Sequence, residues 1–153
     1  MNPIFADLVW PALLLEGRML TWWAILAGLI IEYFFVRLIT NLPPAKTVWA
    51  DVAMNAASAA LGLFLIPIAG IAWEFFPGII IYKIFNIGTF NPGTWVATIF
   101  MAAFINTFIE RAALRKFFEQ PVTGRREFWL LFAGNFLSVA LAFASLLAFR
   151  PKL

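Results

Sequence analysis

The sequence predicts an all-α integral membrane protein with four transmembrane helices. Of its 153 residues, 63% are hydrophobic and 12% are charged, and a soluble chain of this length could not hide so much apolar surface from water. Four segments reach the roughly 20 apolar residues that a helix needs to cross a bilayer. They span about 19–39, 48–72, 94–117 and 128–149. We expect one membrane domain, 1–153, built as a four-helix bundle.

Two short links join the expected helices into antiparallel hairpins. Pro43 and Pro44 stop the first helix, and Pro121 and Gly124 interrupt the chain between the third and the fourth. The links and their flanks carry seven basic residues, Arg37, Lys46, Arg111, Arg115, Lys116, Arg125 and Arg126. The opposite side carries four, Arg18, Lys83, Arg150 and Lys152. The positive-inside rule then places the links in the cytoplasm and both termini outside, in a plasma membrane of the bacterial inner-membrane type.

Two further segments do not fit simple membrane spans. Residues 3–17 are apolar but contain Pro11 and Glu16, so we expect a short interfacial helix that leads into the first span. Residues 73–93 form an outer loop that is too long to be featureless, so we expect it to be ordered. Its β-branched run 79–82 lies between turn-forming residues and is compatible with a small hairpin, a re-entrant segment or a cap on the outer surface.

A short polar pattern occurs twice, about half a chain apart. Glu32 and Arg37 recur as Glu110 and Arg115, at an offset of 78 residues. Around the second and fourth spans the offset is 80, and Trp49, Ala53, Asn55 and Ser58 recur as Trp129, Ala133, Asn135 and Ser138. The pattern predicts a parallel duplication, with repeat 1 over about 19–72 and repeat 2 over about 94–149. A pseudo-twofold axis would then run along the membrane normal, unlike the in-plane axis of inverted repeats.

The repeated residues predict a polar layer inside the membrane. Glu32 and Glu110 lie about seven residues before the cytoplasmic helix ends, which is on the order of 10 Å at a rise of about 1.5 Å per residue. Asn55 and Asn135 lie at a similar depth on the following helices. A carboxylate accepts hydrogen bonds and a carboxamide donates them, so each glutamate has a matched partner. Asn106 shares a helix face with Glu110 and adds another amide.

Two interpretations of this layer remain open. The glutamates either form a hydrogen-bonded clamp between helices or bind protons or cations near a symmetry axis. Asp51, Ser58 and Ser138 follow three- and four-residue steps on faces suited to close helix contact. On the cytoplasmic side, the basic residues are expected to be snorkelling anchors or to pair with the layer, and they are Arg37, Arg111 and Arg115.

The composition argues against catalysis. The chain has no Cys and no His, which removes thiolate chemistry and the commonest metal ligand and proton shuttle. Its two aspartates, Asp7 and Asp51, are expected on opposite sides of the membrane. We therefore expect no catalytic residues, no metal site, no cofactor and no binding of nucleic acid.

The leading functional interpretation is a non-catalytic accessory, scaffold or regulatory partner in a membrane complex. The chain has almost no soluble surface, so the lipid bilayer and a membrane-protein partner or a second copy are the expected contacts. The alternative is a small proton- or cation-coupled transporter or channel that uses Glu32 and Glu110.

Overall fold

The computed structural model describes residues 9–85 and 92–148. They form α1 (Val9–Met19), α2 (Trp22–Ile39), α3 (Pro44–Trp73), a five-residue π-helical turn (Glu74–Gly78), α4 (Ile79–Phe85), α5 (Pro92–Phe117) and α6 (Arg125–Ala148). The described chain contains no strand. The prediction of an all-α protein is therefore confirmed.

Four helices, α2, α3, α5 and α6, are long and apolar enough to cross a membrane. They cover the four predicted spans. α3 begins at Pro44, four residues earlier than expected, because a proline is well tolerated in the first helical turn, where its missing N–H has no partner to lose. The same helix continues through Pro67 to Trp73, since ending it there would leave more backbone groups unpaired in hydrocarbon.

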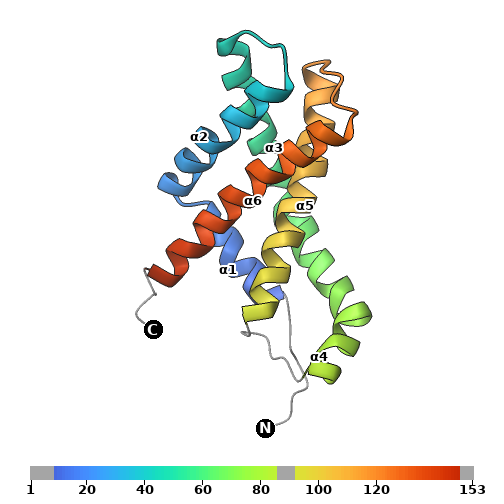
Figure 1. Cartoon of the computed structure of the whole chain (residues 1–153). Helices are drawn as coiled ribbons and strands as arrows, with labels where there is room; N and C mark the ends of the chain where they lie inside the picture. Colours follow the sequence, from blue (N-terminus) through green and yellow to red (C-terminus); the bar gives the residue numbers. More distant parts are fainter. Residues whose placement is uncertain (1–8, 86–91, 149–153) are drawn as a thin grey trace.

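The four long helices form one bundle whose two short links lie at the same end (Figure 1). α3 packs most extensively against α5, and α2 packs against α6. α5 and α6 are also closely packed, whereas α2 contacts α3, its own hairpin partner, much less. The seam between α2 and α3 is consequently more loosely packed than the α3–α5, α2–α6 and α5–α6 contacts.

α1 is a short helix in the region where an interfacial helix is predicted, and residues 1–8 of that region lie outside the described part. It packs against α3, α5 and α6 at the bundle end opposite the links. Leu15 of α1 is fully buried beside Ile66 and Val139. α1 therefore contributes to the core of the bundle, and its position at a membrane interface stays a prediction.

The predicted outer loop contains helix rather than hairpin in its described part. The chain kinks at Phe76 inside the π-helical turn and continues as α4, which includes the β-branched run. Gly78 permits this path, because a Cβ there would lie 2.6 Å from the carbonyl oxygen of Trp73. The alternative of a small hairpin formed by the β-branched run is thus wrong for Ile79–Phe85. An apolar segment next to hydrocarbon satisfies its backbone most easily as a helix, which outweighs β propensity. Residues 86–91 of the loop lie outside the described part.

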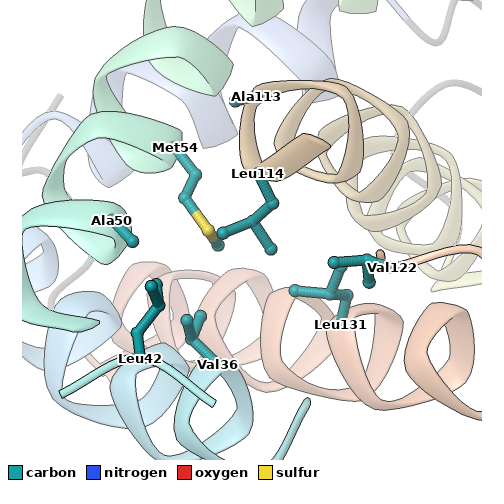
Figure 2. Packing of buried hydrophobic residues seen from close by; sticks show 8 residues of the cluster. All are labelled: Val36, Leu42, Ala50, Met54, Ala113, Leu114, Val122 and Leu131. Carbon is teal, nitrogen blue, oxygen red and sulfur yellow. The ribbon is translucent and has the colours of Figure 1, made fainter. Parts of the chain in front are cut away.

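Two clusters of buried apolar side chains fill the bundle. The link-side cluster draws on all four long helices and both links (Figure 2), and it comprises Val36, Leu42, Ala50, Met54, Ala113, Leu114, Val122 and Leu131. The distal cluster lies toward the other end and comprises Leu15, Ile66, Ile99, Ala102, Val139 and Ala142. The buried polar residues between these two clusters include Ser58 of α3, Asn106 and Glu110 of α5, and Asn135 and Ser138 of α6, whereas Asp51 lies at the level of the link-side cluster.

α2 and α6 approach each other closely because of two glycines. A Cβ at Gly28 would lie 3.1 Å from the hydroxyl oxygen of Ser138, and a Cβ at Gly134 would lie 3.1 Å from the ring of Phe35. Small residues allow such close packing between membrane helices. The glycine at position 28 therefore makes room for the Ser138 hydroxyl at the level of the polar layer.

Candidate functional site

Glu32 joins three helices at the level predicted for the polar layer. Its Oε2 accepts a hydrogen bond from Asn55 Nδ2 of α3 at 2.8 Å, and its Oε1 accepts one from Ser138 Oγ of α6 at 2.6 Å. The carboxyl group is buried. The first bond lies within one hairpin and the second connects the two hairpins.

Glu110 of α5 pairs with Asn135 of α6, and Ser58 of α3 lies within hydrogen-bonding reach of the same carboxyl group. Asn135 Nδ2 donates to Glu110 Oε2 at 2.5 Å and to the backbone oxygen of Leu131 at 3.2 Å. Glu110 is only 1% exposed, and its Oε1 is buried without a hydrogen-bond partner among the described residues. Ser58 lies beside this carboxyl group, and its hydroxyl donates to the backbone oxygen of Asn55 at 3.1 Å.

Asp51 is a third carboxyl group in the same region. It is buried, and its Oδ1 lies 3.3 Å from Asn55 Nδ2, the nitrogen that also donates to Glu32. Glu110 lies close enough to both Asp51 and Glu32 for their charges to interact with it. From the sequence we expected Asp51 only on a helix-contact face. The structure instead places it with the two glutamates, and these three residues are the carboxyl layer.

In the part of the chain that the structure describes, no basic side chain pairs with the carboxyl layer. The charged groups that act on its three members are acidic, and in the described chain the nearby arginines donate to backbone carbonyl groups instead. Three ionised carboxylates without counter-charges would be very costly in a low-dielectric interior. No group of three acidic, His or Cys side chains in the described chain is placed to hold a metal ion. Protons are then the simplest charge compensation.

Asn106 is buried without using its acceptor. The residue is 4% exposed, and its Oδ1 has no hydrogen-bond partner among the described residues. From its spacing we expected it to join the layer through Glu110. The side chain lines a cavity instead. An unpaired buried acceptor costs about 1–3 kcal/mol, so its presence calls for an explanation.

A cavity of about 250 Å³ lies along the loose seam between α2 and α3. Its polar side is formed by Glu32, Asn55, Ser58, Asn106 and Ser138. Its walls contain the small residues Ala24, Gly28, Ala56 and Ala59. The sequence analysis did not identify this cavity. The available signal was the four- and three-residue spacing of these small side chains on two consecutive helices.

The cytoplasmic-side arginines pair differently from the sequence repeat. Arg37 Nη1 donates to the backbone oxygen of Leu42 in the first link at 2.6 Å. In the second link the corresponding bonds come from Arg111, whose Nε donates to Val122 O at 2.7 Å and whose Nη2 donates to Thr123 O. Arg115, which matches Arg37 in sequence, is exposed and has no hydrogen bond in the described structure. The arginine that holds each link is therefore the one whose side chain reaches the backbone carbonyl groups of that link, and not the one at the matching position of the repeat.

Replacing Arg111 by alanine is expected to lower the free energy of unfolding by about 1–3 kcal/mol, because two charge-assisted hydrogen bonds to the second link are lost. Arg115→Ala is the matched control and should change it by less than about 0.5 kcal/mol. Denaturant titration in mixed micelles measures both values. Equal losses in the two variants would contradict the assignment of Arg111 as the residue that holds the link.

Arg18 makes a contact with α6 that its position in the sequence does not predict. Its Nε donates to Ser145 Oγ of α6 at 2.8 Å, and its guanidinium lies 5.4 Å from the centre of the Trp23 ring. In the sequence, Arg18 contributes only to the number of basic residues on the side opposite the links, which is used to predict the orientation. The contact ties the turn between α1 and α2 to α6, at the distal end of the cavity.

No protein-family model, curated protein or solved structure matches this chain. Function therefore has to be inferred from the contacts of the carboxyl layer and its cavity. The layer combines three buried carboxyl groups with an adjoining cavity. Ionisable groups inside a membrane protein are functional candidates by default.

Proposed function

We propose that this protein is a small proton-coupled membrane transporter or channel, and that Glu32, Asp51 and Glu110 are its proton-binding residues. The observation that carries the proposal is the accumulation of three buried carboxyl groups with no basic partner in the described chain. Such a layer must take up positive charge to exist in hydrocarbon, and it can release that charge when water reaches it.

A purely structural clamp is less well supported. A clamp needs donors and acceptors in matching numbers, whereas this region gathers three buried carboxyl groups and leaves the Asn106 Oδ1 acceptor without a partner among the described residues. Buried polar clusters of this kind are often no more stabilising than apolar packing of similar volume. The extra acceptors therefore favour a binding role over a scaffolding role.

Under the proposal, the positions of the two hydrophobic clusters indicate which state of the transport cycle this structure represents. The link-side cluster lies between the two glutamates and the links, at the depth of Asp51, and the distal cluster lies between the glutamates and the other end of the bundle. Water is thus excluded from both directions, which corresponds to an occluded state. Transport would require one cluster to open while the other stays closed.

The proposal includes the parallel duplication of the two hairpins. In each hairpin the glutamate lies seven residues before the helix end, Glu32 before Ile39 and Glu110 before Phe117. Each glutamate also accepts a hydrogen bond from an asparagine of its own hairpin. Reciprocal packing of α2 on α6 and of α3 on α5 is what a twofold axis along the bundle would produce. Two hairpins of common origin would give each repeat one proton-binding glutamate.

The proposed orientation places the links in the cytoplasm and both termini outside, in a plasma membrane of the bacterial inner-membrane type. The excess of Lys and Arg around the links supports it. With this orientation the carboxyl layer is closer to the cytoplasmic surface. We also propose that the protein catalyses no covalent chemistry, since the chain has no Cys nucleophile and no His to activate the Ser58 and Ser138 hydroxyls beside the carboxyl groups.

Proton flux in liposomes tests this function. The protein is reconstituted with a pH-sensitive dye inside the vesicles, and a pH gradient is applied in each direction with valinomycin and potassium present. We expect flux above that of protein-free vesicles, and its loss in Glu32→Gln and Glu110→Gln. Glu119→Gln, in the exposed second link, is the matched control and should retain the flux. Flux that persists in the first two variants, or its absence from the parent protein, would overturn the proposal.

A second candidate function is the accessory partner of a membrane complex. It is favoured by α2, most of which is unburied in the bundle, with Leu26, Ile30, Phe34 and Leu38 exposed along the helix. A partner helix or a second copy would cover this face. Gentle purification from the native membrane tests it: a stoichiometric companion or a stable homo-oligomer would support this role, and a monomer that carries flux alone would exclude it as the main role.

A further inference from the structure

We propose that the cavity between α2 and α3 binds an amphiphilic organic amine in its protonated form, which enters sideways from the bilayer. This inference rests on the proposed function and names the class of substrate whose movement the proton-binding residues would couple to. It is carried by three properties of the cavity: what its floor lacks, where its mouth opens and what its walls are made of.

The floor of the cavity holds a carboxyl group that has no cationic partner among the described residues. Asn106 lines the cavity, although its side-chain oxygen is buried from water and has no partner among the described residues. The Glu32 carboxyl group lies on the same floor, and its hydrogen bonds come only from neutral groups, Asn55 and Ser138. A ligand that takes the place of the proton proposed on Glu32 must carry positive charge, and it can donate a hydrogen bond to the carboxylate. A protonated amine does both, whereas an anion or an ether does neither.

The mouth of the cavity opens to the side of the bundle. Ile25 of α2 and Val52 of α3 line the cavity and are 44% and 37% exposed, so they form a rim on the outer surface of two membrane-spanning helices. The two hydrophobic clusters lie between the polar layer and the two ends of the bundle. A ligand therefore arrives through the hydrocarbon, which requires an apolar body.

The walls set the size of that body. Between the rim and the floor the cavity is lined by alanines, Gly28 and Leu29, so the ligand makes apolar contacts along most of its length. A volume of about 250 Å³ is slightly below the range of about 300–1,000 Å³ that is usual for drug-sized ligands. The expected ligand is a small amphiphile with one ammonium group and a single short hydrocarbon body.

Equilibrium binding of radiolabelled octylamine tests this inference. The full chain is placed in nanodiscs of zwitterionic lipid, and the uptake of empty nanodiscs is subtracted. Octanol and octyltrimethylammonium are the matched probes, since the first lacks the charge and the second lacks the N–H donors. We expect one saturable octylamine site per chain, and affinities at least about tenfold weaker for both other probes. Equal affinity for octanol would show a purely apolar or lipid-filled cavity and would overturn the inference.

Two substitutions localise the site without altering the carboxyl layer. Ala59→Phe fills the cavity and should weaken octylamine binding at least about tenfold, whereas Ala60→Phe lies on the same helix outside the cavity and should bind like the parent. Ala56→Phe, at an exposed part of the cavity lining, replaces Ala59→Phe if the latter does not fold. Unchanged binding in the cavity-filling variant that folds would overturn the assignment of the site.

Proton flux measured on the same preparations separates the two proposals. If octylamine does not bind but Glu32→Gln still abolishes the flux of the parent protein, the cavity inference fails and the proposed function stands. If octylamine binds as expected but the parent protein carries no flux, the proposed function fails and the cavity is a binding site only.

Discussion

Asn135→Ala is expected to lower the free energy of unfolding by about 2–4 kcal/mol, the larger of the two effects expected for the asparagines of the layer. Asn135 donates to Glu110 at 2.5 Å, so the substitution removes this partner from a buried carboxyl group and leaves only the Ser58 hydroxyl beside it in the described structure. The matched variant, Asn55→Ala, should cost less, because Glu32 keeps its bond from Ser138. Denaturant titration in mixed micelles gives both values.

A double-mutant cycle isolates the pair. In Asn135→Ala combined with Glu110→Leu, both members of the buried pair are gone and no carboxyl group is left unpaired. The combined loss should therefore be smaller than the sum of the two single losses by at least about 1 kcal/mol. Additive losses would contradict the direct pairing of Glu110 with Asn135.

Leu114→Ala is expected to destabilise the protein by about 2–4 kcal/mol and to raise passive proton leak. Leu114 is fully buried in the link-side cluster (Figure 2). It follows Glu110 by one helical turn along α5, toward the second link. Its truncation removes packing and opens a path along which water approaches the carboxyl layer. Unfolding titrations measure the loss of stability. Proton flux in liposomes, with no gradient of any substrate added, measures the passive proton leak.

Leu38→Ala is the control for the link-side cluster. Leu38 is an exposed leucine of α2 on the surface that we assign to lipid, so its truncation removes apolar surface without creating an internal cavity. It should cost less than about 1 kcal/mol and should not alter the leak. A leak in Leu38→Ala equal to that in Leu114→Ala would mean that general loosening, rather than access to Glu110, is responsible.

The membrane helices were predictable because hydrocarbon imposes a simple rule. A segment of about 20 apolar residues must satisfy its own backbone, so length and composition alone locate α2, α3, α5 and α6. The same rule explains the error at Ile79–Phe85. There the β-branched run and the flanking turn residues favoured a hairpin as one option, but the chain is helical.

The polar layer was predictable in depth but only partly in content. Counting residues from the helix ends placed Glu32 and Glu110 at one level, and their spacing matches the helix ends in the structure. Asp51 is a member of the layer that the sequence does not predict. It lies there because Asn55, one turn away on the same helix face, contacts the carboxyl groups of both Asp51 and Glu32. Such sharing depends on side-chain conformations that a sequence pattern does not specify.

The cavity could not be predicted because it depends on how two helices are inclined to each other. Alanine and glycine on α2 and α3 are equally compatible with close contact, and that is how small residues are usually interpreted. Here Gly28 does allow close contact, but with Ser138 of α6. The approach of α2 to α6 leaves the seam toward α3 open, and this choice between neighbours is a property of the whole bundle.

Infrared spectroscopy of the carboxyl groups tests the central claim, that the carboxyl layer holds protons, most directly. The purified protein in lipid is measured at neutral pH in H₂O and in D₂O, where the C=O stretch of a protonated carboxyl group is separate from the carboxylate bands and shifts on deuteration. We predict such a band in the parent protein, with reduced intensity in Glu110→Gln and Glu32→Gln and unchanged intensity in Glu119→Gln. A parent spectrum that contains carboxylate bands only would contradict the claim.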